Sequence, residues 1–132
     1  MKAIYIPAEI TLAIELVEID ESQAFNQRFK PYVGPGYVER VSISDHRSRT
    51  EFVKGRTSVT MLVNDEGLIQ RMPWNKRAGT LYGTQLHGSP IAGGAVLLGE
   101  KRMNDGDIDF CDLPEHYQNL EFWTLYFSCF GA

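Results

Sequence analysis

The spacing of apolar side chains along the chain predicts several short strands and a few helices. Alternating or continuous runs rich in isoleucine, valine and tyrosine are typical of strands. Such runs occupy residues 2–6, 12–19, 37–43, 57–63 and 91–98. We therefore expect a single compact α+β, or mixed α/β, domain. It would hold a mixed, mostly antiparallel sheet of about five or six strands and two or three helices.

A different spacing predicts the first helix. Phe25, Phe29 and Val33 recur every fourth residue, which places them on one helical face. The polar residues just before this run can cap a helix start, and Pro31 is expected to stop the helix. These signals predict a helix over residues 22–32.

Capping residues predict a second helix over residues 76–82, with Asn75 as its N-cap and Gly83 at its end. The C-terminal pattern is ambiguous. Leu120, Trp123, Phe127 and Phe130 fit a helix, whereas alternation from Trp123 to Cys129 fits a strand. Both interpretations stay open, although Pro114 favours a short helix starting there.

The 132 residues predict one domain spanning 1–132. The polar residues 44–57 predict a loop or arm inserted between two strands. For residues 100–132 the sequence predicts an acidic linker followed by an aromatic C-terminal element.

Composition narrows the class of protein. The apolar share of 43% and the charged share of 23% are ordinary for a globular domain. A net charge of −4 is too small for an acidic DNA mimic and of the wrong sign for a typical duplex binder. The sequence contains no run of about 20 apolar residues, so we expect no membrane span. With only Cys111 and Cys129, we expect free thiols in a reducing cytoplasm.

Four segments together resemble a known family. They read KAIYIPA from Lys2, VNDEG from Val63, MPWNKRAGT from Met72 and IAGGAVLLG from Ile91. In this order they are similar to small phage- and actinobacterial-borne proteins grouped only as a domain of unknown function. The resemblance covers most of residues 1–99. It implies a phage or mobile-element origin and a small α/β fold, but no catalytic residue.

The segment from Trp74 to Thr80 is the first candidate site. Asn75 at a helix start, with Lys76 and Arg77 beside it, could bind an anion, and Trp74 could stack on a base. This predicts a nucleotide or phosphate site formed by Trp74, Asn75, Lys76, Arg77 and Thr80. The alternative is an ordinary helix cap with two solvated cations and a half-buried tryptophan.

A basic segment is the first candidate for contact with a partner. The basic residues Arg47, Arg49, Lys54 and Arg56 could bind an acidic surface, or they could belong to a solvated loop. The acidic residues from 105 to 115 could complement them in a second copy of the chain.

The aromatic residues near the C-terminus are the second partner candidate. Trp123, Tyr126 and Phe130 could pack on the sheet or form an exposed patch for a partner.

No catalytic, metal or cofactor motif stands out. The three histidines are scattered, and the acidic run from Asp105 lacks the glycine and glutamate of a calcium-binding loop. We therefore expect a small phage-type accessory protein that binds a host protein without catalysis and so inhibits or redirects a host process. The alternative is a protein that sequesters a nucleotide or a nucleotide-derived signal through Trp74–Arg77.

Overall fold

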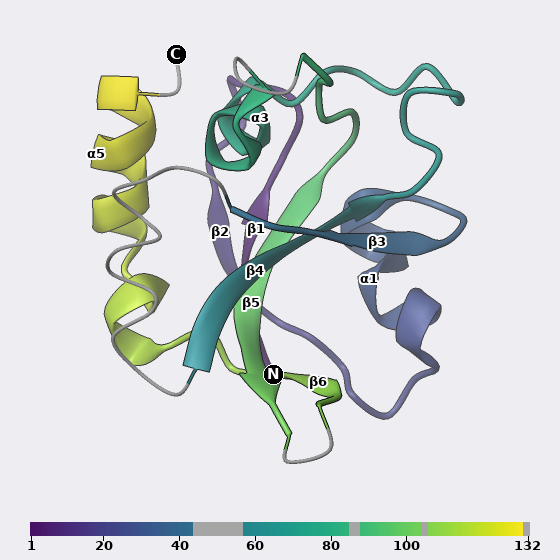
Figure 1. Cartoon of the computed structure of the whole chain (residues 1–132). Coiled ribbons are helices and arrows are strands. Elements are labelled where there is room, and N and C mark those ends of the chain that lie inside the picture. Colours follow the sequence, from purple (N-terminus) through teal and green to yellow (C-terminus); the bar gives the residue numbers. More distant parts are fainter. Residues whose placement is uncertain (44–56, 85–87, 104–105, 131–132) are drawn as a thin grey trace.

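The computed structural model describes residues 1–43, 57–84, 88–103 and 106–130 (Figure 1). In these ranges the strands are β1 (Lys2–Ile6), β2 (Glu15–Glu18), β3 (Val38–Val41), β4 (Thr57–Asn64), β5 (Ala95–Arg102) and β6 (Ile108–Cys111). The helices are α1 (Phe25–Val33), α3 (Lys76–Tyr82) and α5 (Leu120–Phe130), with a short 3-10 turn, η1 (Glu115–Gln118), before α5. The chain is thus an α+β domain, as the sequence predicts.

The strands form one antiparallel sheet in the order β2-β1-β5-β4-β3. β6 pairs with the second half of β5, where Arg102 lies opposite Ile108. In the described residues, β2 and β3 are therefore the outermost strands of this order, while β6 pairs with β5 alone. β5 crosses the middle of the sheet, which explains why its residues Ala95 to Gly99 are all buried.

Helices cover both faces of the sheet, because alternate residues of its central strands are apolar on both sides. Ile4, Met61 and Leu97 face one way and pack beneath α3, η1 and α5. The other face carries Ala3, Leu62, Val96 and Leu98, which pack against Phe29 and Val33 of α1. Figure 1 shows α5 and α1 on opposite sides of the sheet.

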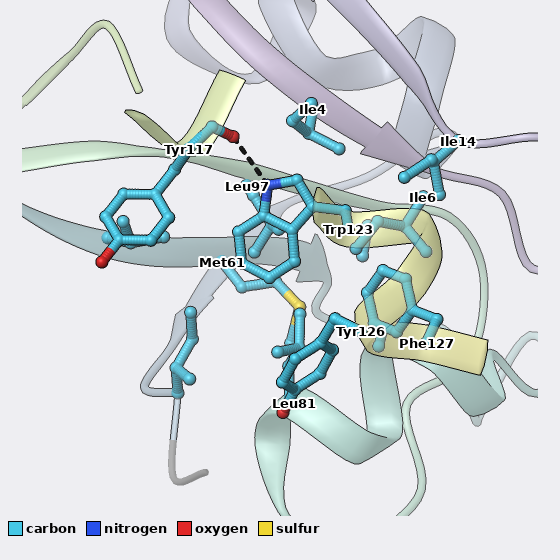
Figure 2. Packing of buried hydrophobic residues seen from close by; sticks show 14 of the residues in the cluster. Ile4, Ile6, Ile14, Met61, Leu81, Leu97, Tyr117, Trp123, Tyr126 and Phe127 are labelled. Carbon is cyan, nitrogen blue, oxygen red and sulfur yellow. Dashed lines mark hydrogen bonds between the residues drawn. The ribbon is translucent and has the colours of Figure 1, made fainter. Parts of the chain in front are cut away.

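The C-terminal segment is a helix, which resolves the ambiguity in its sequence pattern. Trp123, Tyr126 and Phe127 are buried on one face of α5, whereas Leu125 is 60% exposed. Trp123 packs among Ile6, Leu97 and the rings of its own helix (Figure 2). Its indole Nε1 donates to the carbonyl of Tyr117 at 2.6 Å, so the polar atom of this buried ring is satisfied.

The first helix begins and ends later than its sequence predicts. Ser22 does not cap it, because the helix begins later, with Ala24 at the N-cap; the N–H and hydroxyl of Ser22 instead donate to the carboxylate of Asp20, at 3.0 and 2.6 Å. Pro31 lies inside α1 rather than stopping it. Gly34 ends the helix, with a φ of 90° that favours glycine, and its N–H donates to Lys30.

Three predicted strands are shorter or shifted, and the strand expected over 37–43 is limited to β3. The strand expected over 12–19 is reduced to β2, because residues before Ile14 form a turn. The strand expected over 91–98 begins at Ala95 and continues to Arg102. Ala92 instead forms an isolated bridge with Trp74. The predicted acidic linker also contains a strand, β6, since pairing with β5 outweighs its weak apolar pattern.

Candidate protein-binding surface

The side chain of Asn75 ties three parts of the chain together. Its Nδ2 donates to the carbonyls of Ile6, at 2.9 Å, and Gly93, at 3.0 Å. Its Oδ1 accepts from the N–H of Ala78 at 3.0 Å, which is the predicted N-cap. Asn75 is only 2% exposed. The cap prediction is confirmed, and the amide also holds the end of β1 beside the segment that leads into β5.

Arg77 has a similar internal role. Its Nη2 donates to the carbonyls of Pro7 at 2.8 Å, Glu9 at 3.1 Å and Leu12 at 2.9 Å. Arg77 is 9% exposed, and burial lowers the pKa of its guanidinium. A guanidinium bonded to three carbonyls fixes the course of the loop between β1 and β2. These contacts engage Nη2 alone, which carries two of the five N–H donors of the guanidinium.

Of the five residues of the predicted nucleotide site, three are bonded within the chain and two face outward. Asn75 and Arg77 are buried and bonded within the chain. Thr80 donates its hydroxyl to the carbonyl of Lys76 at 3.1 Å. Trp74, 65% exposed, and the exposed Lys76 are the two that face outward.

The residues that Asn75 and Arg77 anchor expose large apolar side chains. Ile10 is 51% and Leu12 is 55% exposed on the loop bonded to Arg77, and Trp74 directly precedes Asn75. We call these three side chains the loop surface. Figure 1 shows both segments at the end of the sheet where β1 ends and β5 begins. Exposed apolar side chains on segments held by buried hydrogen bonds are typical of a binding surface.

Sequence reasoning missed Ile10 and Leu12. The prediction placed Leu12 in a strand, where an apolar side chain needs no further explanation. The available signal was Pro7 and Glu9, which interrupt the apolar run and leave Ile10 in a turn.

The other predicted contact residues are either outside the described residues or buried. Arg47, Arg49, Lys54 and Arg56 lie outside the described residues, as does the side chain of Phe130. Trp123 and Tyr126 are 0% and 6% exposed. Their rings pack into the core, which is one of the two alternatives that the sequence left open, so we do not propose them as a binding surface.

A hollow of about 670 Å³ lies beside β6, at the other end of the sheet. Charges of both signs line it, including Lys2, Lys101, Glu21 and Asp112, together with Cys111. Asp112 accepts a hydrogen bond from the backbone of Lys2 at 2.8 Å. This mixture of charges favours neither an anionic nor a cationic ligand.

The described residues contain neither a cluster of metal ligands nor a helix that could span a membrane. No three side chains of histidine, cysteine, aspartate or glutamate come together there as a metal site. None of the helices described has the length and apolar character to cross a membrane.

Comparison with known proteins identifies the fold and the family. Over 89% of its length, the chain superposes with a TM-score of 0.56 on the crystal structure of the small RNA methyltransferase HEN1. It spans only 15% of that chain and is 16% identical to it, so the likeness concerns the fold alone. No curated protein matches the chain. The model of a domain of unknown function, DUF3846, matches residues 1–126, and the chain therefore belongs to the DUF3846 family.

Proposed function

We propose that this chain is a non-catalytic protein-binding module that contacts its partner through the loop surface. The observation that carries the proposal is the exposure of Ile10, Leu12 and Trp74 on segments fixed by Asn75 and Arg77. Exposing these side chains costs free energy in the isolated chain, and covering them with a partner would recover it. Because the loop is already fixed, little conformational entropy would be lost on binding.

A second part of the proposal concerns the identity of the partner. We propose a phage-encoded protein that acts in the cytoplasm of its host and binds one host protein, inhibiting or redirecting its activity. The resemblance to small phage-borne proteins supports this choice. The exposed tryptophan also supports a protein partner, since tryptophan is enriched at the energetic centres of interfaces.

Site-specific photo-crosslinking tests the loop surface directly. A photoreactive benzoylphenylalanine would replace Trp74, or Leu12, in the full chain expressed in host cells. We expect a discrete adduct with one other protein from either position. Leu125 is a matched control, because it is 60% exposed but lies on α5.

Two outcomes would overturn the proposal. One is the absence of an adduct at both loop positions, and the other is the same adduct from Leu125. Nucleotide binding through Trp74 and Lys76 predicts a different result. A nucleotide that raises the unfolding temperature of the native chain, but not of Trp74→Ser, would favour that alternative.

A further inference from the structure

The outer side of β2 is an open sheet edge in the described residues. β2 pairs with β1 on one side and ends the strand order of the sheet. Leu16 is 43% exposed, and the side chain of Glu18 is 68% exposed. The edge also continues directly from the loop that carries Ile10 and Leu12. An open edge strand presents unpaired backbone groups that can pair with another extended chain.

The register of the β1–β2 pair identifies the backbone groups that point outward. The N–H of Ile19 donates to the carbonyl of Met1 at 2.7 Å, and the Met1 amine donates back to Ile19 at 3.0 Å. In an antiparallel pair, alternate residues exchange such bonds. Val17 therefore bonds to β1, opposite Ala3, whereas the N–H and C=O groups of Leu16 and Glu18 face away from the sheet.

The side chains of β2 indicate which extended segment would fit. The strand reads acidic, apolar, apolar, acidic from Glu15 to Glu18. Asp20 and Glu21 follow, so this stretch carries four carboxylates, against Lys2 of β1 and the Met1 amine, which pairs with Glu18 at 2.7 Å. Opposite charges directly across a strand pair stabilise it, and like charges destabilise it. A second copy of β2 would set glutamate against glutamate, which disfavours self-pairing.

We infer that β2 is a docking edge for an extended segment of a partner protein that reads basic, apolar, apolar, basic. This inference rests on the proposed function and adds the chemistry of the partner. The segment would add a strand beside β2 and bond to the outward groups of Leu16 and Glu18. Its two cations would lie opposite Glu15 and Glu18, and its apolar side chains opposite Leu16 and Val17. The pattern of β2 is the same in both directions, so it fits either strand direction.

A capped peptide, Thr-Lys-Val-Val-Lys-Thr, is the probe. We expect it to shift the backbone amide resonances of Leu16 and Glu18 in the full chain, while those of the other outermost strand, β3, stay in place. The peptides Thr-Val-Lys-Lys-Val-Thr and Thr-Glu-Val-Val-Glu-Thr should bind about tenfold more weakly, because their charges lie at the wrong positions or have the wrong sign.

Two matched protein variants separate the backbone from the side chain. Leu16→Pro removes an outward N–H but no bond to β1, so it should weaken peptide binding about tenfold. Leu16→Ala keeps that N–H and should weaken binding less than about threefold. Equal binding by both variants would overturn the inference.

Modified peptides give the same test on the unaltered protein, should Leu16→Pro fail to fold. N-methylation of alternate residues gives two versions of the probe, and only one set of donors can face β2. One version should lose binding and the other should keep it; equal behaviour of the two would overturn the inference. If the probe binds β2 but crosslinking finds no partner at the loop surface, only the proposed function fails.

Discussion

The neighbours of Arg77 in sequence do not reveal what its guanidinium contacts in the folded chain. The sequence marks it as a cation beside a helix start, and the structure bonds its guanidinium to three carbonyls of the loop after β1. A cation near a helix N-terminus looks the same in sequence whether it faces a ligand or a carbonyl. The tertiary fold decides, because only there do Pro7, Glu9 and Leu12 meet Arg77.

Removing the charged end of Arg77 should loosen that loop. Arg77→Met keeps the aliphatic stem and leaves three carbonyls without their donor, so the free energy of unfolding should fall by about 1.5–3 kcal/mol. Denaturant titration measures this loss, and hydrogen exchange should accelerate at residues 8–13. Lys76→Met, at an exposed neighbour, should change neither quantity. Unchanged exchange in Arg77→Met would show that these bonds do not fix the loop.

Asn75 allows capping to be separated from bridging. Aspartate caps a helix as well as asparagine does, but it cannot donate to the carbonyls of Ile6 and Gly93. Asn75→Asp should therefore lower the free energy of unfolding by about 1–3 kcal/mol, although the cap remains. If thermal and denaturant unfolding show Asn75→Asp to be as stable as the native chain, capping is the only role of this residue.

At the scale of elements, two glycines differ in what an added Cβ would meet. A Cβ on Gly94 would collide with the carbonyl of Tyr32, at the end of α1, and lie 2.9 Å from the Tyr5 ring. A Cβ on Gly79 would lie 2.9 Å from the Thr84 hydroxyl, which could turn away only by giving up its exposed bond to the carbonyl of Ser89. The sequence shows both as glycine and does not distinguish them.

Alanine should therefore lower the free energy of unfolding at Gly94 but not appreciably at Gly79. Gly94→Ala should be destabilised by more than about 2 kcal/mol, because backbone at the end of α1 would have to move. Gly79→Ala lies inside α3, where the better helix propensity of alanine offsets the disturbed Thr84 bond, so stability should change by less than about 1 kcal/mol. Thermal unfolding of the pair measures the difference, and equal unfolding temperatures would contradict it.

At the scale of the whole molecule, the pH dependence of stability should report on Glu39. Burial first, then the charge of Asp65 and a hydrogen bond with Asp65, raise the pKa of Glu39 above its ordinary value of 4.5. The folded chain thus holds this proton more tightly than the unfolded chain. The resulting stability is complete below pH 4.5 and is lost as the pH rises through the raised pKa.

Glu39→Gln should remove this loss of stability at higher pH. At pH 7 the variant should exceed the native chain in free energy of unfolding by a few tenths of a kcal/mol, since Glu39 is largely screened by solvent. The gain should vanish well below pH 4.5. Urea titrations across this range, followed by the fluorescence of buried Trp123 in a Trp74→Phe background, measure it. A gain that persists at low pH would point to a cause other than this carboxyl.

The local pattern of the chain determined several elements by itself. The helix of residues 76–82 has the predicted bounds and the Asn75 cap, because capping depends on neighbours within a few residues. β1 was equally predictable from its apolar run. Phe29 and Val33 face the core as their spacing predicts, since a helix repeats that spacing wherever it lies.

Tertiary structure decided the remaining elements and the candidate surface, because these depend on partners distant in sequence. α5 is a helix because Trp123, Tyr126 and Phe127 bury one face against the sheet, which its sequence pattern alone did not select. β6 exists because β5 provides an edge to pair with. The candidate surface arises in the same way: Asn75 and Arg77 bond to residues about 70 positions away and fix the loop that exposes Ile10 and Leu12.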